Sequence, residues 1–522
     1  MAGGGGAQGS GEIYRDVTGN ERVVAGRLRA ATVDEVVELV RWARDGGETL
    51  YPVSTGLNWG YGSALPVRDG SWILDLSGMD RIRNADAISV DHPVAVIEPG
   101  VTQGQLRAFL DAHCPDLTFN VTGAARGTSL IGCALDRGVG YYGPRSEDLF
   151  GLEVVTGTGE VVHTGFRRLG EAAPLAHTHP HGLGPVLDGL FSQSNLGIVT
   201  SACLRLHPRR PRNVAVSLAL RRTDRLGALV TVLARLKREG LLTSVMHIGN
   251  RARTRATLSF RIREYLEAAC GLPAERAAAE AEGALGLVAP GEWAGIAAVA
   301  GNPGEVRAVL GEIRRRTRHL ARMRVVTEGR LRRGLAVAEV LRFWRPARGC
   351  AAALHALRPL HGLTLGRPTD VALTDLLARS GSDSRDPRDL DASDCGLLFV
   401  NPALPLDGGT VQRIVAGMEQ VAGQHEQTLY MTLNIETATT LVAVVNLLFR
   451  RSEPGATERA HACARALHAY LRSEGVMPYR ARIDMMDGLG VSDADPYWRT
   501  VRGIKGVLDP EGVIAPGRYG PG

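Results

Sequence analysis

The sequence predicts an α+β fold with a second, α/β region inserted, and three observations support that class. The 522 residues are enough for two or three domains and a large buried core. Strand and helix patterns mix over the first 210 residues without the strict alternation of a doubly wound sheet. From about residue 211 the pattern changes to strand–helix–strand.

The first elements are placed by local signals. Thr32–Glu35 has the pattern of a capping box and predicts a helix that ends at Gly46–Gly47. A second capping box, at Thr102 and Gln105, predicts another helix. Strands are expected over residues 49–53, 72–76 and 94–97, and a hairpin over 152–156 and 160–164.

The second half has longer elements. A strand at 213–220, a helix to Arg238 and a strand at 244–249 are expected, followed by arginine-rich helices over 304–345. Residues 441–449 are too few to span a membrane and predict a buried strand, and 458–474 predict an amphipathic helix. Asp509–Tyr519 is turn-rich yet apolar, so we expect it to pack against the rest of the protein. The predicted division is a disordered lead-in at 1–18, domains at 19–210 and 211–475, and a returning segment at 476–522.

Composition excludes several classes of function. The net charge of +6 is spread along the chain, and its short arginine clusters lack interleaved aromatic residues, so no nucleic-acid binding is expected. The seven cysteines are dispersed without a CxxC pair, which indicates reduced thiols in the cytoplasm. The N-terminus lacks a signal-peptide pattern, and no run of 18 apolar residues predicts a membrane span.

Two motifs are candidates for ligand binding. Residues 127–143 are crowded with glycine, which suits a flat or phosphorylated ligand because free amides can approach it closely. Gly138–Gly143 matches GxGxxG, but a predicted helix precedes it and Pro144 follows, so a Rossmann turn is not expected. His177, His179 and His181 lack helical spacing and a neighbouring carboxylate, so a polar loop without metal is expected.

Several longer motifs stand in fixed order at 52–66, 96–102, 135–141, 151–155, 177–200 and 509–518. Together they resemble the vanillyl-alcohol oxidase and 4-cresol dehydrogenase family, strongly over residues 20–210 and more loosely over 395–520. The resemblance implies an α+β FAD-binding domain made from both chain ends, with a cap domain inserted between them. Family members often form dimers, so a homodimer is the expectation.

The resemblance also implies the residues that bind FAD. They are Ser54, Thr55, Gly56, Leu57, Asn58, Pro99, Gly100, Val101, Gly127, Thr128, Ser129, Gly132, Cys133, Arg137, Gly138, Gly140, Tyr141, Gly197, Ile198, Val199 and Arg518.

The FAD is expected to be bound without a covalent link. Members that attach it use a histidine or tyrosine of the cap, and residues 394–402, where the histidine would align, hold neither. Asn58 replaces the histidine of berberine-bridge-type relatives. Cys133 stands where phenol oxidases often have asparagine, and no linkage is assigned to it.

In phenol-oxidising members two tyrosines and an arginine hold the substrate as a phenolate, and these match Tyr61, Tyr479 and Arg480. Two phenol donors and a fixed cation stabilise an oxyanion in a dry pocket. The resemblance therefore implies a para-substituted phenol, or a natural product containing one, that loses hydride to FAD through a quinone methide. O2 or another acceptor would reoxidise the FAD.

One departure leaves the reaction open. The family's active-site aspartate aligns near Ala124, and residues 120–129 contain no acid. Glu147 and Asp148 are the nearest downstream acids and are expected to be solvated loop residues. The alternatives are therefore desaturation, oxidative cyclisation or amine oxidation in secondary metabolism, and a flavin-binding protein that has lost catalysis.

Overall fold

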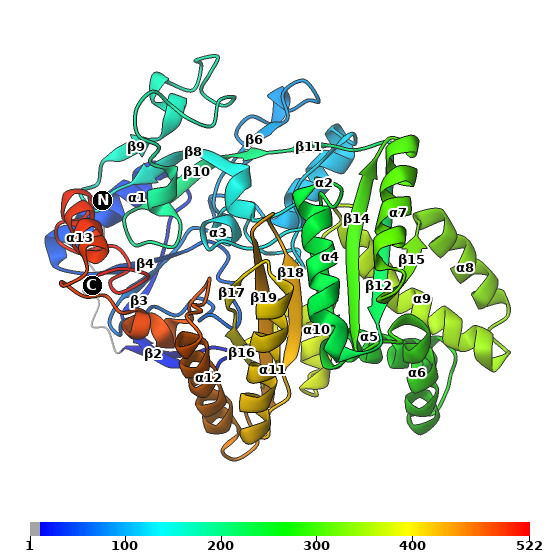
Figure 1. The fold of residues 1–522 in the computed structure, drawn as a ribbon. Coiled ribbons are helices and arrows are strands. Elements are labelled where there is room, and N and C mark those ends of the chain that lie inside the picture. Colours follow the sequence, from blue (N-terminus) through cyan, green and yellow to red (C-terminus); the bar gives the residue numbers. More distant parts are fainter. Residues whose placement is uncertain (1–10, 522) are drawn as a thin grey trace.

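An eight-stranded antiparallel sheet forms the centre of the second region in the computed structural model, which describes residues 11–521 (Figure 1). The strands run in the order β15-β12-β14-β13-β18-β19-β16, and β17 pairs with β19. Their bounds are β12 (Arg212–Leu220), β13 (Met246–Asn250), β14 (Trp293–Gly301), β15 (Ala321–Val326), β16 (Cys395–Val400), β17 (Ala403–Pro405), β18 (Tyr430–Ile435) and β19 (Thr440–Arg450).

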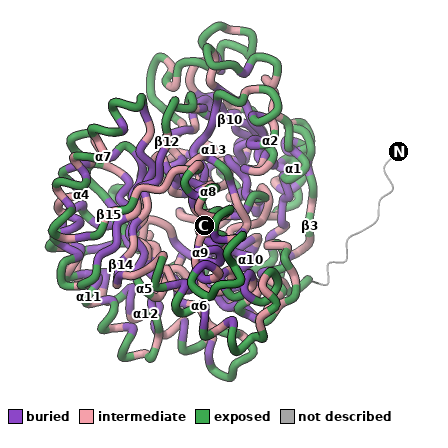
Figure 2. Tube along the Cα trace, turned by 90° about the vertical axis from the view of Figure 1, so that its right-hand side faces the viewer, coloured by how far each residue is buried: buried purple, intermediate pink, exposed green. Residues whose placement is uncertain are grey.

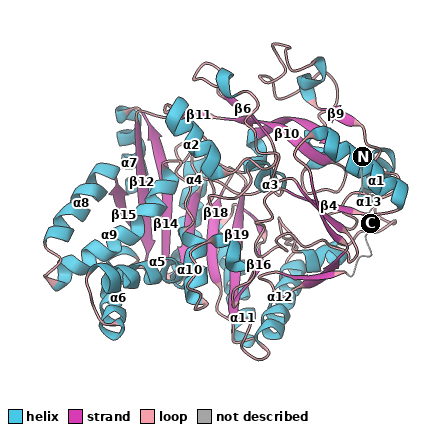
Figure 3. Ribbon diagram, turned by 180° about the vertical axis from the view of Figure 1, so that it is seen from behind, coloured by secondary structure: helices cyan, strands magenta, loops and turns pink. Residues whose placement is uncertain are grey.

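Helices lie on both faces of this sheet, as the opposite views in Figures 1 and 3 show. One group shares the largest hydrophobic core with the sheet: α4 (Leu226–Arg238), α7 (Pro303–Thr317), α11 (Gly408–Gln424) and α12 (Ala456–Ser473). The other group is α5 (Arg251–Glu264), α6 (Ala274–Val288), α8 (Glu328–Val340), α9 (Arg345–Thr364) and α10 (Val371–Arg379).

The alternation of side chains along β18 gives the sheet two different faces. Met431, Leu433 and Ile435 are fully buried in the core with the first group of helices. Thr432 and Asn434, between them, line a cavity on the opposite face. The sheet therefore contributes one face to stability and the other to the site.

The first region contains two smaller sheets. The parallel sheet of β3 (Gly26–Arg29), β5 (Trp72–Asp75) and β4 (Leu50–Val53) packs with α1 (Val33–Gly46). The antiparallel sheet has the order β6 (Val94–Ile97), β10 (Ile198–Arg205), β8 (Leu149–Val155) and β9 (Val161–His163). The remaining elements are β1 (Glu12–Arg15), β2 (Glu21–Val24), α2 (Gln103–His113), β7 (Leu117–Thr118), α3 (Leu130–Leu135), β11 (His207–Pro208) and α13 (Pro496–Leu508).

The end of the chain packs against its beginning. Val513 accepts a hydrogen bond from the amide of Leu50 at 2.8 Å, and the amide of Ala515 donates to the carbonyl of Leu50 at 2.8 Å. Figure 1 shows the red C-terminal segment beside the blue first strands. Lys505 is buried beside this segment, and its ammonium forms an ion pair with Asp509. Figure 2 shows the buried residues concentrated inside both regions.

Local signals predicted most elements correctly, with three differences. The capping box of Thr32 and Glu35 is present, but Gln105 donates to the carbonyl of Asp80 instead of completing a box with Thr102. The arginine-rich segment contains the unexpected strand β15. Residues 1–10 of the predicted lead-in lie outside the described residues, whereas Glu12–Arg15 forms β1 and pairs with β2. No helix among residues 11–521 is long and apolar enough to cross a membrane.

Candidate functional site

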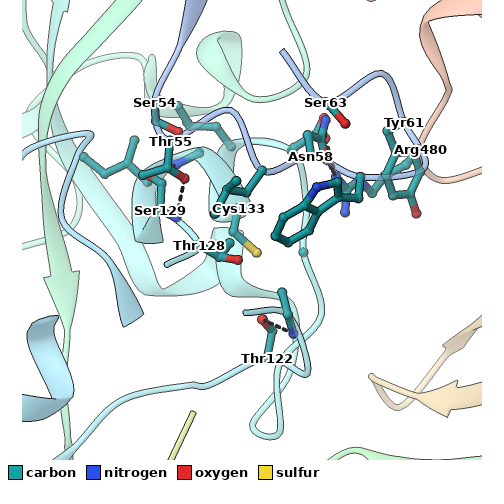
Figure 4. A pocket seen from close by; sticks show the side chains of 18 of the residues that line it. Ser54, Thr55, Asn58, Tyr61, Ser63, Thr122, Thr128, Ser129, Cys133 and Arg480 are labelled. Atoms are coloured by element: carbon teal, nitrogen blue, oxygen red, sulfur yellow. Dashed lines mark hydrogen bonds and ion pairs between the residues drawn. The ribbon is translucent and has the colours of Figure 1, made fainter. Parts of the chain in front are cut away.

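A cavity of about 460 Å³ lies between loops of the first region and the face of the eight-stranded sheet that carries Thr432 and Asn434. Ser54, Thr55, Ser129 and Cys133 line one part of it, and Tyr61 and Arg480 line another (Figure 4). Because the walls come from distant parts of the chain, a bound molecule would contact both regions.

The loop that follows β4 presents a row of backbone donors. The amides of Thr55, Gly56, Leu57 and Asn58 donate to no acceptor within residues 11–521. Gly56 has a φ of +71°, in the left-handed region that glycine adopts without strain. Consecutive free amides in such a turn form a site for an anion, such as a pyrophosphate. The loop is thus fitted to the phosphates of a dinucleotide.

The start of α3 holds this loop in place. The amide of Ser129 donates to Oγ1 of Thr55 at 3.2 Å, and Ser129 caps the helix by accepting from the amide of Gly132 at 2.9 Å. A Cβ atom on Gly132 would lie 2.5 Å from Oγ of Ser54. A glycine is therefore required here because the loop approaches the helix closely.

Most of the residues expected to bind the cofactor lie at this cavity. Those that line it are Ser54, Thr55, Gly56, Leu57, Asn58, Pro99, Thr128, Ser129, Gly132, Cys133, Gly138, Tyr141, Gly197, Ile198, Val199 and Arg518. Those that do not line it are Gly100, Val101, Gly127, Arg137 and Gly140.

Two of the glycines serve the packing of the protein. A Cβ on Gly140 would lie 2.0 Å from Oδ1 of Asn120, and one on Gly138 would lie 2.3 Å from Sγ of Cys133. Gly140 therefore makes room for a buried asparagine instead of approaching a ligand. The GxGxxG match at Gly138–Gly143 follows α3, as the sequence predicted, so it is not a strand–turn–helix of the Rossmann type.

Tyr61, Tyr479 and Arg480 come together at the cavity although they are far apart in sequence. The Cζ atom of Arg480 lies 3.9 Å from the centroid of the Tyr61 ring, and Phe399 stacks on that ring at 4.7 Å between centroids. The carbonyl of Tyr479 accepts a hydrogen bond from Gln193 at 2.8 Å. The predicted trio thus forms one cationic and aromatic corner.

Asn401 orients the Tyr61 hydroxyl. Its Nδ2 donates to the Tyr61 oxygen, while its Oδ1 accepts from the amide of Val445 at 3.0 Å, which fixes the direction of the carboxamide. Because the tyrosine oxygen accepts from Asn401, the phenolic hydrogen remains free to donate.

Asp136 is the counter-ion of the corner. It is buried and forms an ion pair with Arg480, and its Oδ1 lies 3.5 Å from Nη2 of Arg518. Asn58 donates to Asp136 at 3.1 Å and accepts from Arg480 at 2.7 Å. Asp136 was not among the site residues expected from the sequence, because its arginine partners are more than 300 residues away.

The charges in this corner are fixed by burial and by one another. Burial raises the pKa of Tyr61 above its ordinary value, although Arg480 and Tyr479 act against it. Burial acts to raise the pKa of Asp136, but Arg480 and Arg518 hold it below its usual range. Burial acts to lower the pKa of Arg480, and Asp136 raises it well above the ordinary value. At neutral pH the tyrosines are therefore neutral donors beside an arginine cation and an aspartate anion.

His247 on β13 is a further cavity residue that the sequence analysis missed. Its Nδ1 lies 2.8 Å from Oδ1 of Asn434, its cross-strand partner, so Nδ1 carries the proton. Its Nε2 is buried without a partner among the described residues. Burial lowers the pKa of His247 to about 4, so the ring is neutral and Nε2 is a free acceptor.

Unpartnered polar atoms in the cavity wall offer donors and acceptors to a polar ligand. Among residues 11–521, buried polar atoms without a partner belong to these lining residues: Trp59, Thr128, Ser194, His247, Asn446 and Arg480. Buried polar groups are normally paired. The donors and acceptors in this wall, together with the free loop amides, fit a flavin dinucleotide and a polar substrate.

The acids considered as replacements for an active-site aspartate do not reach the cavity. Ala124 lines it, as the alignment implied, but neither Glu147 nor Asp148 does. Glu147 is exposed. Asp148 is not the solvated acid that was expected, because it is buried and accepts from Asn120 at 2.9 Å and from His207 at 3.3 Å.

The histidine loop makes local contacts. Nδ1 of His179 lies 2.6 Å from the carbonyl of His181, and His177 contacts Glu171 at 2.5 Å, so a carboxylate does lie beside the loop, contrary to expectation. Glu171 comes within 4.8 Å of Glu153 and His163, a grouping that could hold a metal. Arginine ion pairs occupy both of those carboxylates, and the absence of a metal remains a prediction.

Comparison with known proteins places these features in context. Residues 24–165 match the family model described as an FAD binding domain. The chain is 33% identical over 498 residues to 1'-carboxy-chondrochloren decarboxylase of Chondromyces crocatus, covering 93% of this chain and 88% of that protein. It is 25% identical over 499 residues to the flavoprotein subunit of 4-cresol dehydrogenase of Pseudomonas putida, covering 94% and 87%. The structure of 4-ethylphenol oxidase from Gulosibacter chungangensis in complex with isoeugenol superimposes with a TM-score of 0.80 at 24% identity, covering 97% and 92%.

Proposed function

The chain belongs to the vanillyl-alcohol oxidase and 4-cresol dehydrogenase family of FAD-dependent oxidoreductases, and from that membership we propose that it oxidises a para-substituted phenol. The phenol can be a small molecule or part of a larger natural product. FAD, held by the loop after β4, α3 and Arg518, supplies the hydride acceptor when bound, and O2 or another acceptor removes the electrons. We also propose that residues 19–210 and 476–522 form the FAD domain, that 211–475 form the cap, and that the chain forms a homodimer.

One observation carries the proposal: Tyr61, Tyr479 and Arg480 converge on one corner of the cavity. The free hydrogen of Tyr61 and the unpartnered Nε of Arg480 can both donate to a phenolate oxygen. Charge-assisted hydrogen bonds of this kind contribute about 1.5–3 kcal/mol each. By stabilising the phenolate, these side chains increase the electron density at the para carbon, which favours loss of hydride from the benzylic position.

The substrate would then be a quinone methide, which takes up water or rearranges. An added water must give up a proton, and His247 Nε2 is the neutral imidazole acceptor in the cavity wall. Asn434 holds the ring in the tautomer that leaves Nε2 free. We propose that His247 accepts this proton in place of the active-site aspartate, which is absent here.

Oxidative decarboxylation is a second candidate, supported by the relative named as a decarboxylase, which is 33% identical over nearly the whole chain. In that case the quinone methide formed by hydride loss would release CO2 from a carboxylate on the carbon next to the benzylic one, and the electron pair of the broken bond would form a double bond and restore the phenolate. The two candidates share the phenolate corner and differ in the product, so release of CO2 separates them.

Anaerobic mixing with a series of 4-alkylphenols tests the proposal. Bleaching of the FAD absorbance is expected, and Tyr61→Phe, Tyr479→Phe and Arg480→Ala should each slow it by at least tenfold. Tyr497→Phe serves as a control because Tyr497 is exposed and lies outside the cavity lining. Reduction at unchanged rates in all three cavity variants would refute the phenolate role.

A further inference from the structure

Arg253 is a cation in the cavity wall that the proposed chemistry does not use. It lies in the first turn of α5, and its backbone amide donates to the cap residue Asn250 at 2.9 Å. Its guanidinium takes part in no hydrogen bond or ion pair within the part of the chain that the structure describes. An arginine in this setting has donors available for a ligand.

The side chain of Arg253 packs beside a glycine on β13. A Cβ atom on Gly249 would lie 3.6 Å from Cγ and 3.8 Å from Cβ of Arg253, so the arginine stem lies on the face of β13 toward which a side chain at Gly249 would point. Gly249 pairs with Thr432 and lies two residues from His247, and both of these residues line the cavity. Arg253 therefore lies along the same sheet face as the proposed proton acceptor.

The neighbouring charges do not neutralise Arg253. Asp375 acts on it electrostatically, but the Oδ1 of Asp375 is bound to Nε of Arg261 at 3.0 Å. Arg379 adds another positive charge nearby. Burial lowers the pKa of Arg253, yet a guanidinium remains charged at neutral pH. Arg253 is half-buried, and a charge taken partly out of water is favoured by an opposite charge beside it, so this position favours an anion.

We propose that Arg253 binds a carboxylate on the side chain of the substrate, so that the substrates are 4-hydroxyphenyl compounds with an acidic side chain. This substrate class rests on the proposed phenol oxidation. One unpaired guanidinium balances a monoanion, and its planar fork matches a carboxylate. The pyrophosphate of FAD is the other anion available, but the free loop amides suited to it belong to Thr55–Asn58 of the first region, whereas Arg253 belongs to α5 of the second.

Three probes distinguish binding of the phenol from binding of the carboxylate. 4-Ethylphenol carries only the phenol, 3-phenylpropanoate carries only the carboxylate, and 3-(4-hydroxyphenyl)propanoate carries both. Their dissociation constants are measured on the FAD-loaded protein under anaerobic conditions, from the concentration dependence of the bleaching rate for the two phenols and from the perturbation of the FAD spectrum for 3-phenylpropanoate. Arg253→Met should raise the ratio of the constant for 3-(4-hydroxyphenyl)propanoate to that for 4-ethylphenol at least tenfold. Arg253→Lys, which keeps the charge without the fork, should raise it less.

Arg255→Met is the matched control, because Arg255 lies on the same helix and pairs with Glu282 at the surface. It should leave the ratio within twofold of the wild type. A ratio within twofold for Arg253→Met would overturn the subsite, and so would loss of FAD from both Arg253 variants, which would assign the arginine to the cofactor. If no phenol bleaches the FAD but 3-phenylpropanoate binds in an Arg253-dependent way, the phenol oxidation fails while the carboxylate subsite stands.

Discussion

The guanidinium of Arg480 lies over the ring of Tyr61, with Cζ 3.9 Å from the ring centroid, while its Nη2 pairs with Asp136. Contact with an aromatic face contributes about 0.5–2 kcal/mol to holding a cation in place. The two contacts fix the plane of the guanidinium and leave its Nε unpartnered. A donor held in this way requires little reorganisation when an oxyanion arrives.

Asp136→Asn should destabilise the fold, because it leaves Arg480 and Arg518 without their buried counter-ion. Breaking a buried ion pair costs about 3–5 kcal/mol in the free energy of unfolding. The pKa of Asp136 is held below its ordinary value, so its stabilisation is complete above pH about 4 and is lost as the pH falls through the lower folded value. Denaturant unfolding of both proteins at pH 7 and at low pH measures this. Asp45→Asn, at an exposed pair with Arg44, should change stability by less than about 1 kcal/mol, and an equal effect of the two variants would contradict the prediction.

His247→Gln should lower the yield of hydroxylated product at least tenfold and affect FAD reduction much less, because the imidazole acts after hydride loss. Since the pKa of His247 is about 4, the wild-type yield should be level from pH 6 to 8 and decline as the pH approaches 4. Product analysis beside anaerobic bleaching measures the two steps. His319→Gln, at an exposed position, is the control. Equal losses in both steps would show that His247 does not act on water.

The FAD should be released by acid precipitation, leaving a colourless pellet and a yellow supernatant. β16 covers most of the stretch where a linking histidine would align, and it carries neither histidine nor tyrosine. Cys133 lines the cavity, so Cys133→Ser is the control variant, and it should release FAD on acid precipitation as the wild type does. Colour retained in the pellet of the wild type but not of Cys133→Ser would instead identify a thioether.

Gly140→Ala should destabilise the protein by about 2–4 kcal/mol, since the new Cβ would lie 2.0 Å from Oδ1 of Asn120. Asn120 binds both the carbonyl of Gly143 and the carboxylate of Asp148, so it cannot move freely. Gly283→Ala, inside α6 with open space around it, should stabilise by about 0.5–1 kcal/mol. Thermal unfolding of the two variants should therefore shift in opposite directions, and a shared direction would argue against the packing role.

Some helices and strands can be predicted from the sequence and others cannot. The first helix is predicted because its cap is local, and Thr32 and Glu35 are three residues apart. β15 was missed because Arg322 and Arg324 resemble a helical run, although arginines on an outer strand protect a sheet edge from association.

The same contrast applies to the site. Tyr61, Tyr479 and Arg480 could be identified because each lies in a recognisable motif. Asn401 could not, because nothing near it in sequence indicates a contact with Tyr61, 340 residues away. Arg253 could not be identified either, because its place in the cavity wall depends on how α5 packs on the sheet.

The two faces of β18 have a consequence for how the protein can diverge. Thr432 can be exchanged without disturbing Met431 and Leu433, which anchor the opposite face, whereas Asn434 is also needed to hold His247. New substrate preferences can therefore arise by single substitutions that cost little stability. A one-residue insertion in the strand would have the reverse effect, because it would turn the leucine toward the substrate and the asparagine into the core.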